Sequence, residues 1–271
     1  MKFPILVSDL DGTLVDHQGN IHPADVALLA AQKLPARLIL ATGRSLGSVR
    51  ATFSRHNLFL KNPLPFAMVL HNGAVGLLPE EKLVHYAHFD AALQKHLVEV
   101  LRHFDRITTL FFHQDDCYFM YLTPFGVQAA ELYGYHPMPL TAQASQLPFS
   151  KIMCISDSPP LLDEVSQQVR HLPAGNSYSM PTIFELAPPG VNKASGLKAL
   201  LKALGCEGLP LFIAGDGGND LEMLQMAEVS FSPQTSPLEI RQMVDRVIDT
   251  SQCGLLKPML AAAGITDRVV S

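Results

Sequence analysis

Two aspartates one residue apart follow a short apolar run near the start of the chain. The run covers residues 3–7, and Asp9 and Asp11 stand in the sequence Asp-Leu-Asp-Gly-Thr. Asp-Gly alone would indicate only a turn, but an apolar run ending in such a turn is typical of a buried strand. Two carboxylates this close repel by about 1 kcal/mol in water and by several times more in a partly buried cleft. A Mg²⁺ ion, which takes hard oxygen ligands, would relieve that repulsion.

Three further segments carry polar residues where predicted strands end or a predicted helix begins. Thr42-Gly43-Arg44 follows the predicted strand 36–41, the segment from Gly215 to Asp220 follows the predicted strand 209–214, and Lys193 opens a predicted helix. Hydroxyl groups and the amides of a helix N-terminus bind phosphoryl oxygens. A phosphate monoester is a dianion that carboxylates repel, so Mg²⁺ together with Lys193 would make attack by an anionic nucleophile feasible.

Each of these segments also has a purely structural interpretation. Most lysines that open a helix are solvated, and Asp216 and Asp220 suit turns and helix caps. The functional interpretation is favoured because the segments follow strands that should end at one edge of a sheet, where ligands of α/β proteins bind.

The order of predicted elements indicates two domains. Strands alternate with helices at both ends of the chain, which predicts an α/β fold with a Rossmann-like parallel sheet formed by residues 1–79 and 189–271. Between them, residues 80–188 combine paired strands with helices, so we expect an inserted α+β domain. Proline or glycine residues lie at both boundaries between the two predicted domains.

The four segments, in this order, resemble motifs one to four of the haloacid dehalogenase (HAD) superfamily. The turn Asn72-Gly73-Ala74 and the long insertion before Lys193 resemble the Cof-type subgroup, whose inserted domain is a type IIB cap. The resemblance covers nearly the whole chain. It implies a HAD core that carries the catalytic site and a cap that sets substrate specificity.

The resemblance implies a Mg²⁺-dependent phosphatase, a phosphoric monoester hydrolase. Asp9 would be the nucleophile that forms an aspartyl-phosphate, and Asp11 the acid and base that serves the leaving oxygen and then water. Lys193 would neutralise the phosphate and the nucleophile. The substrate would be a small phosphorylated metabolite, such as a sugar phosphate.

The resemblance also implies binding residues. Mg²⁺ would be held by Asp9, Asp216 and the backbone carbonyl of Asp11, with Asp220 supporting the metal site from close by. Asn219 would help to hold phosphate or metal-bound water. The implied phosphate-binding set is Leu10, Thr42, Gly43, Lys193 and Asn219, and weaker candidates for substrate contact are Arg44 and Asn72. For Arg44, a structural ion pair is an equal alternative.

The inserted domain offers weaker signals. His113, Tyr118 and Lys151 are candidates to face the cleft, whereas the aromatic residues of 111–121 are expected to form the core of a cap sheet. Zinc binding by His85 and His88 is not favoured, because a strand places residues three apart on opposite faces. Residues 230–235 lack the Gly-Asn-Ala turn common in Cof-type members, and the proline-containing stretch 135–150 is expected to be a loop.

Composition excludes several other classes of protein. A net charge of −5 argues against binding to nucleic acid through bulk electrostatics. The four cysteines form no Cys-x-x-Cys pair, so we expect free thiols in a reducing compartment. Without a signal-peptide pattern or an apolar run of membrane-spanning length, we expect a cytoplasmic protein that is a monomer or weak homodimer.

Other functions on the same fold stay open. A phosphotransferase or phosphomutase would keep the phosphoryl group from water, although Asp11 is present to activate water. A non-catalytic phospholigand sensor would need to lack the nucleophile or the acid, and this sequence has both. A P-type cation pump is not favoured, because it would require membrane spans and the sequence has no apolar run of that length.

Overall fold

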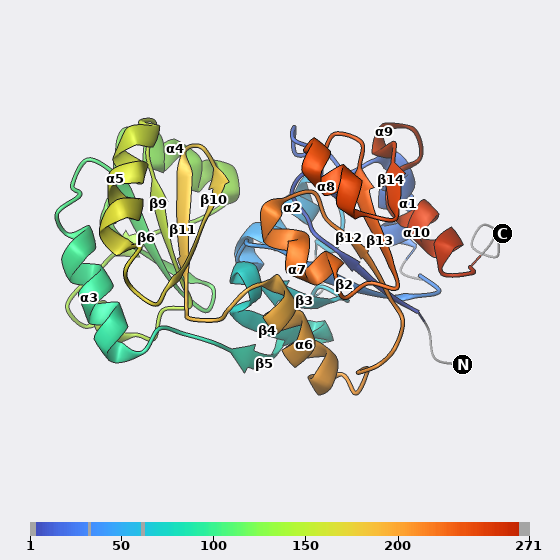
Figure 1. Cartoon of the computed structure of the whole chain (residues 1–271), viewed down its shortest axis with the longest axis horizontal. Coiled ribbons are helices and arrows are strands. Elements are labelled where there is room, and N and C mark those ends of the chain that lie inside the picture. Colours follow the sequence, from blue (N-terminus) through green and yellow to red (C-terminus); the bar gives the residue numbers. More distant parts are fainter. Residues whose placement is uncertain (1–3, 32–33, 61–62, 266–271) are drawn as a thin grey trace. The chain divides into compact units, whose positions relative to one another are not determined.

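The computed structural model describes residues 4–31, 34–60 and 63–265. The chain divides into two compact units (Figure 1). The first comprises Met1–Gly43, Thr52–His85 and Lys193–Ser271, and the second comprises Arg44–Ala51 and Tyr86–Asn192.

The first unit is built on an eight-stranded sheet in the order β14-β13-β12-β1-β2-β3-β4-β5. The run from β14 to β3 is parallel, and β4 pairs antiparallel to β3. Its strands are β1 (Ile5–Ser8), β2 (Arg37–Ala41), β3 (Ala67–Leu70), β4 (Val75–Leu78), β5 (Lys82–Tyr86), β12 (Leu211–Ala214), β13 (Val229–Pro233) and β14 (Arg246–Ile248).

Helices surround this sheet. They are α1 (Pro23–Ala30), α6 (Lys193–Ala203), α7 (Leu221–Leu224), α8 (Leu238–Met243), α9 (Thr250–Cys253) and α10 (Leu256–Ala262), with the 3-10 turns η1 (His71–Gly73), η2 (Pro79–Glu81) and η4 (Gly218–Asp220). Helix α2 (Leu46–Arg55) has residues in both units.

The core of the first unit forms where apolar strands meet the apolar face of α6. Ile5, Val7 and Ile213 of the central strands pack with Leu197 and Leu200 of α6, and all five are at most 1% exposed. Strands buried on both faces are continuous apolar runs, which explains why the sequence predicts them well. This packing fixes the helix that begins at Lys193.

The second unit has a six-stranded sheet in the order β10-β11-β9-β6-β7-β8. Helices α3 and α5 supply one apolar core with the sheet, and α4 supplies another (Figure 1). The elements are β6 (Thr108–His113), β7 (Asp116–Tyr121), β8 (Met138–Pro139), β9 (Lys151–Ile155), β10 (Gly175–Met180), β11 (Ile183–Ala187), α3 (Ala91–Leu101), α4 (Pro124–Tyr133), α5 (Pro159–Val169) and η3 (Ala144–Gln146).

The structure corrects one expectation from the sequence and confirms part of another. The strand predicted near residues 82–89 is β5, and it belongs to the sheet of the first unit rather than to the inserted sheet. Phe111 and Phe112 lie on adjacent positions of β6 and are buried in two different clusters, one for each face of the sheet. Phe111 and Phe112 therefore belong to the core, as predicted.

Candidate active site

The strands that carry the predicted motifs are neighbours in the sheet. Strand β1 lies between β12 and β2, and all three run parallel, so their carboxyl ends share one edge. The backbone continues this pairing beyond the strands, since Asp9 N donates to Ala214 O at 2.9 Å and Thr42 N donates to Val69 O at 2.8 Å. Segments distant in sequence thus begin at one edge, as ligand sites of open α/β sheets require.

The turn after β1 packs directly on the fourth segment. Gly12 has φ +77°, and a Cβ placed there would lie 2.2 Å from Asp216 Oδ2. Only glycine fits this left-handed position against a neighbouring carboxylate. One residue later, Thr13 Oγ1 donates to Asp216 Oδ1 at 3.2 Å. The Gly-Thr pair therefore orients Asp216, a role for Gly12 and Thr13 that the sequence analysis missed although both belong to the first motif.

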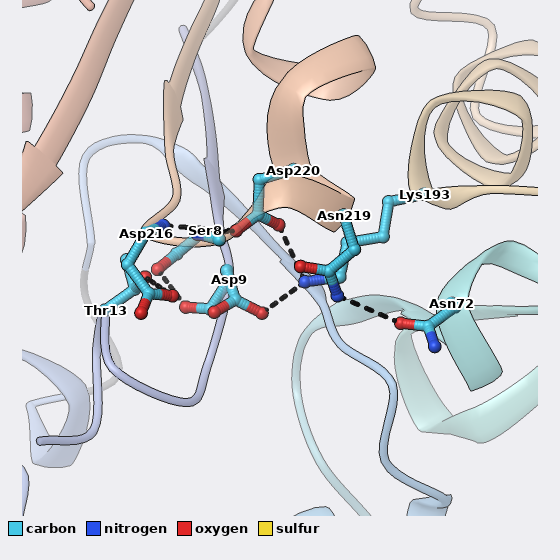
Figure 2. A network of polar contacts seen from close by, with 9 residues as sticks. Ser8, Asp9, Thr13, Asn72, Lys193, Asp216, Asn219 and Asp220 are labelled. Carbon is cyan, nitrogen blue, oxygen red and sulfur yellow. Dashed lines mark hydrogen bonds and ion pairs between the residues drawn. The ribbon is translucent and has the colours of Figure 1, made fainter. Parts of the chain in front are cut away.

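Lys193 joins the first and fourth segments (Figure 2). Its Nζ donates to Asp9 Oδ1 at 2.5 Å and to Asp220 Oδ1 at 2.7 Å. Asp9 and Lys193 are 184 positions apart in the chain. All three side chains are buried, with at most 5% of each exposed. Burial alone would lower the pKa of the Lys193 ammonium group. The carboxylates of Asp220 and Asp9 raise this pKa by more than burial lowers it, so Lys193 is cationic at neutral pH.

Asp220 uses both of its oxygens within the protein. Oδ1 accepts from Lys193, while Oδ2 accepts from Asp216 N at 3.1 Å and from Gly217 N at 3.0 Å. The side chain thus fixes the loop that presents Asp216. This geometry suits the supporting position that the resemblance implied for Asp220, because neither oxygen is left without a donor.

Three carboxylates offer a divalent cation site. One oxygen each of Asp9, Asp216 and Asp220 lies within 4.8 Å of the others. Hard carboxylate oxygens are the ligands that Mg²⁺ prefers, so Asp9 and Asp216 suit that ion, and Asp220, whose oxygens accept N–H groups of the protein, lies beside them. Within the described ranges this is the one group of three acidic, histidine or cysteine side chains with that geometry, and neither His85 nor His88 belongs to it.

The charge balance of the cluster also favours a cation. Burial raises the pKa of Asp9 well above its ordinary value, Lys193 lowers it, and Asp220, Asp216 and Asp11 raise it further. Burial likewise raises the pKa of Asp216, with Asp220 adding to the effect. One ammonium group does not offset these carboxylates, so a bound divalent cation would favour their ionised forms.

The predicted phosphate-binding residues lie at the same edge. Thr42 is 1% exposed, and the amide Nδ2 of Asn219 donates to Asn72 Oδ1 at 3.3 Å. A Cβ on Gly43 would lie 2.9 Å from Asn72 Oδ1, so a larger residue there would displace the Asn72 carboxamide. The Leu10 side chain is fully buried, which leaves only its backbone to contact a ligand.

Two other predicted residues, Asp11 and Arg44, have different surroundings. The Asp11 side chain is exposed. Arg44 belongs to the second unit, where its guanidinium lies 5.3 Å from the Tyr133 ring centre and Nη1 is 3.3 Å from Ser48 Oγ.

The candidate residues of the second unit are held by internal contacts. Lys151 Nζ forms a buried ion pair with Glu185 Oε1 at 2.5 Å. His113 Nδ1 lies 3.0 Å from the hydroxyl of Tyr86. Tyr118 is partly buried against the core of that unit. The sequence could not foresee the Lys151–Glu185 pair, since it depends on the pairing of β9 with β11.

No helix within the described ranges is both long and apolar enough to cross a membrane.

Comparison with known proteins places the chain among hydrolases. Residues 6–254 match the family model of the haloacid dehalogenase-like hydrolases. A curated relative, "Endoribonuclease YBEY, chloroplastic" from Arabidopsis thaliana, is 26% identical over 246 residues, which cover 84% of this chain and 41% of that protein. This chain spans 20% to 52% of the lengths of the first three curated relatives, two of which are named phosphatases.

Solved structures share the fold along its whole length. TM0651 from Thermotoga maritima superimposes with a TM-score of 0.80 at 22% identity, covering 96% of this chain and 97% of the other. The HAD subclass IIB sugar phosphatase BT4131 superimposes with a TM-score of 0.78 at 18% identity, covering 97% and 99%. The predicted core with a type IIB insertion is therefore confirmed as the fold class.

Proposed function

Because the chain belongs to the haloacid dehalogenase-like hydrolase family, we propose that it is a Mg²⁺-dependent phosphatase acting through an aspartyl-phosphate on Asp9. The observation that carries this proposal is the buried contact of Lys193 with both Asp9 and Asp220. A buried lysine between two carboxylates is a costly arrangement for stability alone, and it places positive charge beside the proposed nucleophile.

The chain's own residues supply the steps of the reaction. A carboxylate oxygen of Asp9 attacks phosphorus, and the ester oxygen leaves with a proton from Asp11. Asp11 then takes a proton from water, which attacks the phosphorus of the aspartyl-phosphate and releases inorganic phosphate and the Asp9 carboxylate. Lys193 offsets the negative charge of nucleophile and phosphoryl group throughout.

Asp9, Asp216 and the Asp11 backbone carbonyl would hold the metal, and Asp220 would fix the loop that carries Asp216. When bound, Mg²⁺ supplies charge that reduces the repulsion between carboxylates and phosphate. Leu10, Thr42, Gly43 and Asn219 would bind the phosphoryl oxygens through backbone amides, a hydroxyl and a carboxamide.

The proposed substrate is a small phosphorylated metabolite, and the sugar phosphatase with the same fold favours a sugar phosphate. Residues 1–79 and 189–271 would carry the chemistry, and residues 80–188 would select the substrate. We further propose that the protein is a monomer or weak homodimer.

The test is release of inorganic phosphate from a panel of phosphorylated sugars, cofactors and nucleotides, with Mg²⁺ or with a chelator. Asp9→Asn should abolish release in the presence of Mg²⁺, while Lys198→Met, an exposed change on the same helix as Lys193, should retain it. Full activity of Asp9→Asn would refute the mechanism. Transfer to a sugar acceptor without free phosphate would indicate a phosphotransferase or phosphomutase instead.

A further inference from the structure

The turn after β3 has an unusual backbone. His71, Asn72 and Gly73 all have positive φ values of +51°, +53° and +111°. Two consecutive non-glycine residues in the left-handed region are uncommon, although Asn and His enter it more readily than most residues. Such strain persists only where surrounding contacts hold it, and it is concentrated at functional sites.

One side of this turn contacts two of the predicted motifs. Asn72 N donates to Thr42 O at 3.2 Å, and the Asn72 carboxamide occupies the space that a Cβ on Gly43 would need. Its Oδ1 accepts from Asn219 Nδ2 at 3.3 Å, as Figure 2 shows. A single side chain therefore connects the loop after β2 with the loop after β12.

The other side of the turn contacts α6. A Cβ on Gly196 would lie 2.5 Å from Gly73 O, so the helix backbone approaches the turn as closely as glycine allows. Gly196 lies one turn after Lys193, whose Nζ binds Asp220, the residue next to Asn219. The contacts thus form a closed ring from the turn through α6, Lys193, Asp220 and Asn219 back to Asn72.

From this ring we infer that Asn72 is a positioning residue for phosphoryl transfer, acting through Asn219 on the segment that presents Asp216 and binds Lys193. The inference rests on the proposed function. Asn72 combines two properties that the site needs: it adopts the left-handed backbone, and its carboxamide oxygen holds Asn219. Glycine would supply the first property without the second.

The substitution Asn72→Gly separates these properties. The backbone at φ +53° suits glycine, so folding should be retained, while the acceptor for Asn219 is lost. Asn57→Gly is the matched control, because Asn57 is exposed and also left-handed at φ +56°. With p-nitrophenyl phosphate as probe, we expect Asn72→Gly to lower kcat by about tenfold or more with KM changed by less than about threefold. Asn57→Gly should leave both constants unchanged.

A double-mutant cycle tests whether Asn72 acts through Asn219. In the Asn219→Ala background, Asn72→Gly should lower kcat little further, because the interaction is already removed. Effects that multiply in the double variant would overturn the inference, as would a kcat for Asn72→Gly equal to that of Asn57→Gly.

A second measurement needs no catalysis. Amide hydrogen exchange at Asp216 and Gly217, whose N–H groups donate to Asp220, should be faster in Asn72→Gly than in the wild-type protein and unchanged in Asn57→Gly. If the wild-type protein releases no phosphate or Asp9→Asn keeps full activity, the proposed function fails, and the exchange result then decides only whether Asn72 holds the segment that presents Asp216. Unchanged exchange in Asn72→Gly would refute it.

Discussion

Replacing Lys193 by methionine should destabilise the protein strongly, even without substrate or metal. Methionine keeps the length and apolar stem of the side chain but removes the charge that binds Asp9 and Asp220 at 2.5 and 2.7 Å. Breaking a buried ion pair by removing one partner costs about 3–5 kcal/mol, because the remaining charge is buried and uncompensated. With two carboxylates left in place, we expect a loss of about 3–5 kcal/mol in the free energy of unfolding, a large part of the stability of an ordinary domain.

The assay is urea unfolding at neutral pH in a chelating buffer, followed by circular dichroism because the chain contains no tryptophan. Lys198→Met changes an exposed lysine of α6 and should alter the unfolding free energy by less than about 0.5 kcal/mol. Adding Asp220→Asn to Lys193→Met should recover part of the loss, because one uncompensated charge is removed. A Lys193→Met protein within about 1 kcal/mol of wild type would refute the reasoning, as would a double variant no more stable than the single one.

Three further predictions test the geometry around the site and the sheet edge. Gly12→Ala places a Cβ 2.2 Å from Asp216 Oδ2 at φ +77°, whereas Gly190→Ala, at φ +71°, meets nothing within 4 Å. Thermal unfolding should therefore show a clearly larger fall in unfolding temperature for Gly12→Ala than for Gly190→Ala. Equal falls would contradict the contact. MgCl₂ should raise the unfolding temperature of the wild-type protein, with a stabilisation of about 2.7 kcal/mol at a hundredfold excess over Kd. In Asp216→Asn most of that rise should be lost. An equal rise in both proteins would place the ion elsewhere. Hydrogen bonds from the backbone N–H and the hydroxyl of Ser230 lower the pKa of Asp245. The Asp245 carboxylate therefore stabilises the fold fully at pH values above its ordinary pKa. This contribution is lost as the pH falls through the lowered pKa. Because Asp245 is exposed, Asp245→Asn should cost only about 0.5 kcal/mol at pH 7. In acid unfolding curves the difference from wild type should vanish once the pH falls below the lowered pKa of Asp245. A difference that grows with falling pH would reverse the assigned sign.

The sequence predicted the sheet edge that carries the candidate site because its signals are local. Apolar runs mark the buried strands, and the polar motifs follow them directly, so parallel order alone brings Asp9 and Asp216 to one edge. Lys193 was predicted only in combination with the other three segments, because a lysine at a helix start is usually solvated. The structure gives that lysine two buried carboxylate partners.

The features that were not predicted depend on pairing between distant segments. Strand β5 belongs to the first sheet because it pairs with β4. The sequence pattern of residues 82–86 can indicate a strand, but it cannot show which strand lies beside it. The contact of Gly12 with Asp216, the ion pair of Lys151 with Glu185 and the left-handed backbone at His71 likewise arise from tertiary packing. Local propensity carries little information on such long-range contacts.

The most direct test of the central claim is chemical trapping at Asp9. The protein is mixed with a phosphomonoester that it hydrolyses and with Mg²⁺, quenched in acid and reduced with borohydride, which converts an acyl phosphate of aspartate to homoserine. Mass spectrometry of the peptide containing residues 5–13 should find homoserine at position 9 only, and only when the substrate was present. Unmodified Asp9 together with conversion at another aspartate, or with rapid turnover and no conversion at all, would contradict the account.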